Sequence, residues 1–178
     1  FHTDTLSARK ESESVMFQCI DKAIANGLDI NSVEHLIVNC SLFCPTPSLS
    51  AMIANHYKMK HTINAYNLGG MGCSASLIGL NLAKELLLSH RNSTVLLVSF
   101  ENITQNIYRG SEKSMLISNA LFRCGGAAIV ITNRRAEVHR ASLQRAFVYR
   151  LGRVVRTHIG ASDDAYRAVY QQQDAEGW

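Results

Sequence analysis

The stretch that decides the fold is NLGGMGCSASLIGLNLAKELLLSH, which occupies residues 67–90. It runs from a glycine-rich turn directly into a segment whose apolar residues recur at helical spacing. Those residues are Leu77, Ile78, Leu80, Leu82, Ala83, Leu86 and Leu87. A helix that is apolar around most of its circumference is buried on most sides. The stretch therefore predicts a sharp turn followed by a long buried helix.

Short apolar runs before and after that helix predict the strands of a sheet. They read HLIVNC, TVLLVS and GAAIVIT, and they occupy residues 35–40, 94–99 and 126–132. Runs of this length and composition are typical of buried strands. Residues 61–66 predict another strand, and residues 147–157 predict one or two more.

Two further segments predict helices. Residues 12–26 carry apolar side chains at helical spacing, and Gly27 is a plausible stop signal. Ser48 follows a stretch that two prolines interrupt, and it can cap a helix that ends near Tyr57. Because strands and helices alternate along the chain, the sequence predicts one layered α/β domain. A chain of 178 residues, 47% of them hydrophobic, is large enough to bury a core.

The net charge is +4, with 18 Lys and Arg residues against 14 Asp and Glu residues. Much of the excess lies late in the chain, at Arg134, Arg135, Arg140, Arg145, Arg150, Arg153 and Arg156. A basic segment could attract phosphate, a CoA-like ligand, nucleic acid or an anionic membrane surface. These arginines are spread out and separated by apolar residues, which favours a solvated surface. A nucleic-acid-binding module is therefore the weakest hypothesis.

The five cysteines are Cys19, Cys40, Cys44, Cys73 and Cys124. An odd number without a close pairing pattern argues against a disulfide framework and favours a reducing compartment. Cys40 and Cys44 lie close in sequence, but no second pair or histidine follows at zinc-site spacing. The sequence also holds no apolar run long enough to span a bilayer.

Three positions match the glycosylation pattern, namely Asn39, Asn92 and Asn102. The pattern is short and common, so each match is weak evidence. Asn39 also ends a predicted buried strand, where a glycan has no room.

Cys73 is the candidate nucleophile. Gly69, Gly70 and Gly72 surround it, and glycines permit the positive backbone angles that a sharp strand-to-helix turn requires. Unpaired N–H groups and the positive end of the helix dipole stabilise the thiolate, which is the reactive form. A cysteine that fills space beside a tight turn is one alternative, and a phosphate-binding loop is another. The stretch lacks both GK[ST] and GxGxxG, but the residue pattern alone leaves the choice open.

Five long blocks of the chain carry a family resemblance. They are VNCSLFCPTPSLSAMI (38–53), YNLGGMGCSASLIGLNLAKELL (66–87), SFENITQNIYRG (99–110), KSMLISNALFRCGGAAIVITNR (113–134) and VVRTHIGASDDAYRAVYQQQD (154–174). In this order they resemble the plant 3-ketoacyl-CoA synthases, the condensing enzymes of fatty acid elongation. Those enzymes are in turn similar to type III polyketide synthases of the chalcone synthase type and to thiolases. A type III polyketide synthase relative that uses a smaller or aromatic CoA starter is therefore an alternative.

The resemblance implies a thiolase-like layered fold, a mixed sheet packed by helices. Residues 1–178 are expected to form a single partial domain, the N-terminal half of a condensing-enzyme domain, with the C-terminal half absent. Family members join a long-chain acyl-CoA to malonyl-CoA, release CO2 and free CoA, and leave a 3-ketoacyl-CoA two carbons longer. Cys73 matches the family's nucleophile, which holds the acyl group as a thioester. The resemblance implies no cofactor and no metal.

The family's catalytic His and Asn belong to the second half of the fold, and none of the seven histidines here matches that His. A catalytically incomplete product that keeps the half-fold without them is a further alternative. The resemblance also implies a homodimer that works with other elongase subunits. No nucleic-acid partner is expected, given the spread-out arginines. Full-length relatives are held in the endoplasmic reticulum membrane through N-terminal spans outside this chain.

Several residues within the blocks receive structural interpretations. Cys44 stands where the family commonly has Asn, in a loop expected at the dimer interface. Residues 101–106 and the KSMLISNALF segment are expected to line the cavity or the dimer face. The features interpreted as packing or as solvated surface are Cys124 in the core, His158 as a structural histidine, and Asp163 with Asp164 in a solvated turn.

Overall fold

A computed structural model describes residues 4–135 and 149–178. In chain order the elements are α1 (Thr5–Ala25), η1 (Ile30–Ser32), β1 (His35–Asn39), α2 (Leu49–His56), β2 (Asn64–Leu68), η2 (Gly72–Ser74), α3 (Ala75–Ser89), β3 (Thr94–Glu101), η3 (Thr104–Asn106), α4 (Lys113–Leu121), β4 (Gly125–Thr132) and α7 (Asp163–Tyr166). The alternation of strands and helices predicted from the sequence is confirmed over the first half of this order.

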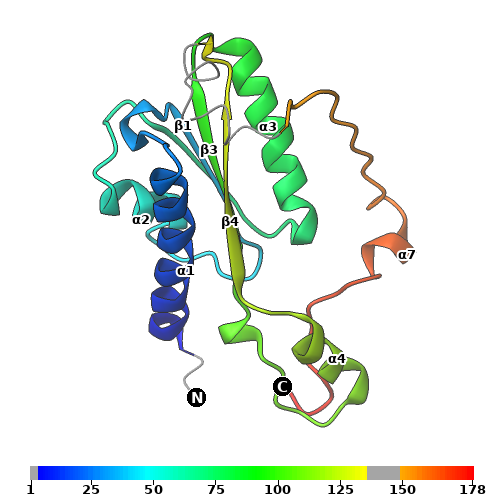
Figure 1. The fold of residues 1–178 in the computed structure, drawn as a ribbon. Coiled ribbons are helices and arrows are strands. Elements are labelled where there is room, and N and C mark those ends of the chain that lie inside the picture. The colour runs from blue at the N-terminus through cyan, green and yellow to red at the C-terminus, as the bar shows by residue number, and fades with distance from the viewer. Residues whose placement is uncertain (1–3, 136–148) are drawn as a thin grey trace.

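Four strands form one mixed sheet in the order β2-β1-β3-β4. Strand β1 runs parallel to both β2 and β3, whereas β4 runs antiparallel to β3. Helices α1 and α2 cover one face of the sheet, and α3 covers the other (Figure 1). The three layers confirm the predicted α/β architecture.

Strand β1 is buried along its whole length because both faces of the sheet are covered at its position. Successive side chains of a strand point to opposite faces. Leu36 and Val38 accordingly belong to the core under α1 and α2, whereas Ile37 joins the core under α3. The same alternation along β3 sends Val95 and Leu97 toward α3.

The helix boundaries follow from capping residues. Helix α1 begins at Thr5 rather than at residue 12, because the Asp4 carboxylate accepts a hydrogen bond from the Ser7 N–H at 2.7 Å. The predicted cap at Ser48 is confirmed, since its hydroxyl accepts from the Ala51 N–H at 3.2 Å.

Two of the predicted strands differ in the structure. Strand β2 occupies Asn64–Leu68 rather than residues 61–66. The prediction of strands at 147–157 is wrong for residues 149–157, which form no regular secondary structure, and residues 147–148 lie outside the described residues. Residues 149–178 are mostly exposed, and none of them belongs to the four-stranded sheet. Their backbone N–H and C=O groups therefore have no neighbouring strand with which to form hydrogen bonds.

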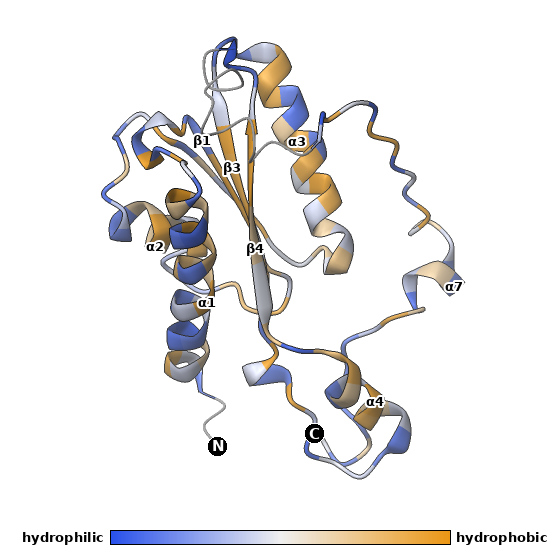
Figure 2. Cartoon of the chain, viewed as in Figure 1, coloured by the Kyte–Doolittle hydropathy of each residue, from blue (hydrophilic) through white to orange (hydrophobic). Residues whose placement is uncertain are grey.

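The prediction that α3 is buried on most sides is wrong. Figure 2 shows α3 hydrophobic along most of its length, yet Leu77 is 59% exposed and Leu88 is 69% exposed. The helix meets the sheet with one narrow face that carries Ala75, Gly79 and Ala83. Gly79 allows a close approach, because a Cβ atom there would lie 2.8 Å from Leu97 Cδ1.

Strand β4 was predicted to be buried, and this prediction is also wrong. Its first three residues are exposed and the remainder is only partly buried. The reason is its position, because β4 is an edge of the sheet in the order of the described strands. None of the helices in the described ranges combines the length and the hydropathy that a bilayer crossing requires.

Candidate functional site

The predicted glycine turn lies between β2 and α3 and carries Cys73 at its end. Gly70 and Gly72 adopt φ values of +67° and +68°, which confirms the need for glycine at these positions. Cys73 is exposed and sits in the single turn η2, two residues before α3 begins at Ala75. The sequence thus located the strand-turn-helix junction, although a 3-10 turn separates the cysteine from the α-helix.

The loop after β1 packs against this turn. A Cβ atom added at Gly69 would lie 2.6 Å from Cys44 Sγ, so the glycine makes room for that thiol. The Cys44 thiol in turn donates to the Cys40 carbonyl at 3.4 Å. Cys44 remains exposed, and its expected position at a dimer interface stays a prediction.

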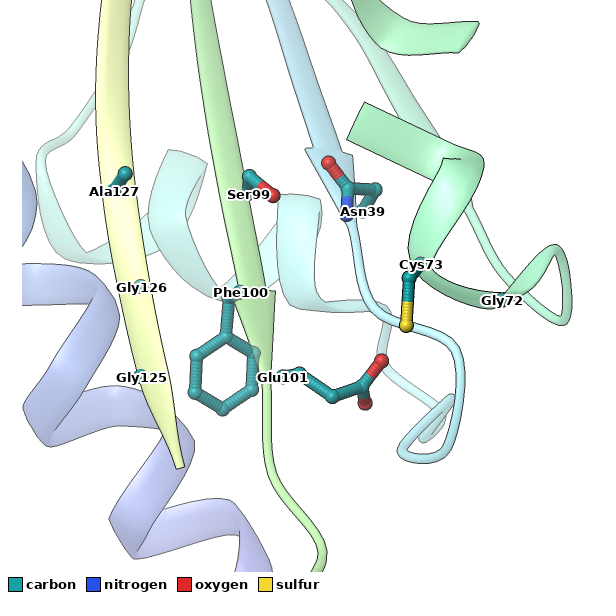
Figure 3. A pocket seen from close by; sticks show the side chains of 9 residues that line it. All are labelled: Asn39, Gly72, Cys73, Ser99, Phe100, Glu101, Gly125, Gly126 and Ala127. Atoms are coloured by element: carbon teal, nitrogen blue, oxygen red, sulfur yellow. The ribbon is translucent and has the colours of Figure 1, made fainter. Parts of the chain in front are cut away.

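Cys73 opens onto a cavity of about 320 Å³ at one end of the sheet (Figure 3). The cavity is lined by Asn39, Gly72, Cys73, Ser99, Phe100, Glu101, Gly125, Gly126 and Ala127. Asn39 is the last residue of β1 and Glu101 the last of β3, so the cavity lies at the carboxyl ends of two parallel strands. Such ends are where α/β sheets commonly place their ligands.

The strand register explains which side chains share the cavity. Asn39 pairs with Ser99 on β3, and Ser99 pairs with Ala127 on β4. Asn39 and Ser99 lie two residues beyond Ile37 and Leu97, so they point to the face of the sheet that α3 covers. The small residues at the start of β4 leave the space that the cavity occupies.

Glu101 links the end of β3 to the loop after β1. Its carboxylate accepts hydrogen bonds from the Ser41 N–H at 2.9 Å, the Leu42 N–H at 3.0 Å and the Cys40 thiol at 3.0 Å. Burial, together with the neighbouring Glu101 carboxylate, raises the pKa of Cys40 to about 12. Cys40 is therefore a buried, protonated hydrogen-bond donor, whereas Cys73 is an exposed cysteine.

The expectation that residues 101–106 line the cavity is confirmed for Glu101. Its role as an anchor of the loop was missed, because its partners lie some sixty residues earlier in the chain. A carboxylate at a strand end beside a predicted nucleophile is the signal that could have indicated it.

The glycosylation pattern at Asn39 and Asn102 falls on buried residues. Asn39 is 6% exposed, as the sequence predicted, and Asn102 is 1% exposed. The Asn102 amide donates to the Ala8 carbonyl at 2.9 Å and to Ser12 Oγ at 3.0 Å, so it holds α1 against the sheet. These two positions have no room for a glycan.

The remaining candidates lie away from the cavity. His158 is exposed, and its Nδ1 accepts from the Gly160 N–H at 3.2 Å. Asp163 and Asp164 are exposed in the first turn of α7. Within the part of the chain that the structure describes, no three His, Cys, Asp or Glu side chains gather as metal ligands would.

The basic segment divides into several environments. Arg134 forms an ion pair with Glu34. The other described members of the segment are exposed, as predicted: Arg135, Arg150, Arg153 and Arg156. Arg140 and Arg145 lie outside the described residues.

Cys124 is partly buried against the core, and burial with the nearby Glu11 carboxylate raises its pKa to about 11.

Comparison with known proteins gives a consistent result. Residues 2–178 match the family described as "FAE1/Type III polyketide synthase-like protein". The chain is 54% identical over 172 residues to 3-ketoacyl-CoA synthase 4 of Arabidopsis thaliana, covering 96% of this chain and 32% of that protein. It is 50% identical over 173 residues to 3-ketoacyl-CoA synthase 9 of the same plant, covering 97% and 33%. The chain thus spans about a third of the length of these curated relatives.

Two solved structures share the fold. Germicidin synthase from Streptomyces coelicolor, a type III polyketide synthase, matches with a TM-score of 0.68 at 24% identity over 78% of this chain and 35% of that one. The 1,3,6,8-tetrahydroxynaphthalene synthase of Streptomyces coelicolor A3(2) matches with a TM-score of 0.61 at 22% identity, covering 72% and 36%. Both likenesses confirm the predicted thiolase-like arrangement of a mixed sheet packed by helices.

Proposed function

Because the chain belongs to the FAE1/type III polyketide synthase-like family, we propose that it forms the nucleophile-bearing part of a very-long-chain 3-ketoacyl-CoA synthase, with Cys73 as the acyl carrier. The observation that carries this proposal is the exposed Cys73 on its glycine turn, opening onto a cavity at the carboxyl ends of two parallel strands. The high identity to plant 3-ketoacyl-CoA synthases supports the substrate class.

The first half-reaction transfers the acyl group. The Cys73 sulfur attacks the carbonyl carbon of a long-chain acyl-CoA, and a carbon–sulfur bond forms to Cys73. The bond to the CoA sulfur breaks, and CoA leaves as its thiolate, which takes up a proton. The acyl group remains on Cys73 as a thioester within the cavity.

The second half-reaction extends the chain. Malonyl-CoA loses CO2, and the electron pair of the broken carbon–carbon bond stays on the remaining acetyl-CoA carbanion. That carbon attacks the acyl carbonyl on Cys73, a new carbon–carbon bond forms, and the Cys73 thiolate leaves. Splitting the condensation in this way predicts ping-pong kinetics.

The proposed enzyme includes catalytic residues and partners that lie outside this chain. By analogy with the family, the catalytic His and Asn belong to the second half of the fold, in an intact protein that forms a homodimer. We place that protein at the endoplasmic reticulum membrane with other elongase subunits, through segments outside this chain. Two alternatives are a catalytically incomplete product and a polyketide synthase relative with a small starter. The type III polyketide synthase structures support only the shared fold, since both are under 25% identical.

The test is a search for the acyl-cysteine intermediate. The intact gene product, its Cys73→Ala variant and its Cys44→Ala variant are each incubated with a long-chain acyl-CoA and digested for mass spectrometry. Cys44 is a matched control because it is an exposed cysteine on the neighbouring loop. The proposal expects one acyl thioester, on the Cys73 peptide, in the wild type and in Cys44→Ala only. A folded wild type that forms no adduct would favour the catalytically incomplete product instead.

A further inference from the structure

Asn39 presents a buried amide that the fold leaves unsatisfied. The residue is 94% buried, being 6% exposed, and its Oδ1 is fully enclosed without a hydrogen-bond partner. No hydrogen bond joins its Nδ2 to any residue in ranges 4–135 and 149–178. Buried polar side chains in folded proteins are nearly all hydrogen-bonded. The enclosed Oδ1 is an acceptor, whereas Nδ2 is not among the enclosed atoms, so its two N–H donors are the part of the amide that a molecule in the cavity can meet.

The neighbours of Asn39 do not supply that partner. Its register partners are Leu68 on β2, which is apolar, and Ser99 on β3, which makes no hydrogen bond to it. Glu101 shares the cavity, but its carboxylate is engaged with the loop after β1. Ala127 brings no polar side chain. The cavity wall therefore keeps one amide whose N–H groups are available to a bound molecule.

The position of the amide relative to Cys73 indicates what that molecule is. Figure 3 shows Asn39 and Cys73 on adjoining walls of the cavity, with the amide nitrogen on the side of the Cys73 sulfur. A thioester formed on Cys73 brings a carbonyl oxygen into this same cavity. That oxygen is a hydrogen-bond acceptor, and it gains negative charge whenever a nucleophile attacks the carbonyl carbon.

We propose that the Asn39 side-chain amide binds the thioester carbonyl of the acyl group on Cys73, donating a hydrogen bond from Nδ2. The inference rests on the proposed function of Cys73. Asn39 is thereby a substrate-contacting residue, distinct from the His and Asn expected in the other half of the fold. Its amide is held in place by the end of β1, so the donor is oriented before substrate enters.

The enclosed Oδ1, which stays without a partner even when Nδ2 binds the carbonyl, also has an effect on stability. Replacing Asn39 with Leu, which has a similar shape, removes a buried polar group that has no partner. The Asn39→Leu variant should therefore melt at a higher temperature than the wild type while it acylates more slowly. An asparagine with a purely structural role would give the opposite change in melting temperature.

The experiment uses the intact gene product and an acyl-CoA labelled with ¹³C at the thioester carbonyl. Acyl-enzyme formation on Cys73 is followed by rapid-quench mass spectrometry, and the carbonyl stretch of the trapped acyl-enzyme is recorded by infrared difference spectroscopy. We expect Asn39→Leu and Asn39→Asp to slow acylation by about a hundredfold, as the loss of one oxyanion donor does elsewhere. We also expect their carbonyl band at higher frequency, because a hydrogen bond to the carbonyl lowers it.

The control is Asn64→Asp, the same change on an exposed asparagine at the opposite end of the sheet. It should leave both the rate and the band at their wild-type values. An unchanged carbonyl band and acylation rate in the Asn39 variants would overturn the inference, and would mean that the Asn39 amide bonds to water instead of to the thioester. If the wild type itself forms no acyl-enzyme, the proposed function has failed, and the melting temperature of Asn39→Leu still tests whether the amide is unsatisfied.

Discussion

The Cys40 thiol donates a hydrogen bond to the Glu101 carboxylate over 3.0 Å, joining the end of β1 to the end of β3. Two backbone N–H groups of the same loop, those of Ser41 and Leu42, point at this carboxylate as well. The Glu101 side chain therefore holds the loop after β1 in place, and this loop packs against the turn that carries Cys73.

Replacing Glu101 with Leu should loosen the loop after β1. The two N–H groups of Ser41 and Leu42 lose their acceptor, and each such loss at a partly buried site costs about 1 kcal/mol or more. Hydrogen exchange of these two amides should accelerate about tenfold or more, while the core of β1 stays protected. The control is Glu85→Leu, on the exposed surface of α3, which should leave the loop unchanged. Unaltered exchange in Glu101→Leu would mean that the carboxylate does not anchor the loop.

The five cysteines should differ in the rate at which their thiols are alkylated. Iodoacetamide at pH 8 should label the exposed Cys44 and Cys73 first, and the partly buried Cys19 and Cys124 slowly. Cys40 should resist, because burial and the Glu101 carboxylate raise its pKa to about 12 and keep it a thiol. Peptide mapping after timed alkylation measures the order, and a urea-unfolded sample should label at all five positions. Rapid labelling of Cys40 in the folded protein would contradict the contact with Glu101.

Glu34 should give the protein part of its sensitivity to acid. Burial alone would raise the pKa of Glu34, but the Thr94 N–H, Lys60 and Arg134 together lower it below its usual value. A carboxyl group with a lowered folded pKa stabilises the fold above its unfolded pKa of about 4.3, and that stabilisation is lost as pH falls through the folded value.

The measurement compares melting temperatures of the wild type and Glu34→Gln from pH 7 down to pH 3. The wild type should be the more stable at pH 7, and the gap should close as the pH falls below about 4. Glu85→Gln serves as the control and should follow the wild type throughout. A gap that stays constant with pH would show that the charge of Glu34 adds nothing to stability.

The turn should require glycine at position 72 only because the backbone there adopts a positive φ. A Cβ atom added there meets nothing within 4 Å, but the residue has φ +68°, which costs an L-residue about 1–2 kcal/mol. Gly72→Ala should therefore lower the melting temperature and slow acylation at the adjacent Cys73. Gly125→Ala is the matched comparison, since its added Cβ also meets nothing within 4 Å and its φ lies outside the left-handed region. Equal melting temperatures for the two variants would contradict the role of the turn.

The parts of the fold that local sequence determines were predictable. The glycine turn, the cap at Ser48 and the buried strand before Asn39 depend on neighbours within a few residues. Each was found from composition and spacing. Cys73 was singled out in the same way, although its role as nucleophile stays a prediction.

The features that depend on distant partners were not predictable. The apolar pattern of α3 does not reveal which of its sides packs against a neighbour, so Leu77 was expected to be buried although it is exposed. The apolar sequence of strand β4 predicts that it is buried, and only the order of the strands in the sheet shows that it lies at an edge. The anchoring by Glu101 and the orphaned amide of Asn39 arise from strand register, which no short motif records.

The pairing of Glu34 with Arg134 also bears on the order in which the chain assembles during synthesis. The two residues lie a hundred positions apart, the first just before β1 and the second just after β4. The three parallel strands can come together only after β3 has been synthesised, since β1 pairs with β3 across some sixty residues. Glu34 pairs with Lys60 as well as with Arg134. A released chain truncated just before Arg134 should therefore form its four strands, yet melt at a lower temperature than a chain that extends beyond Arg134.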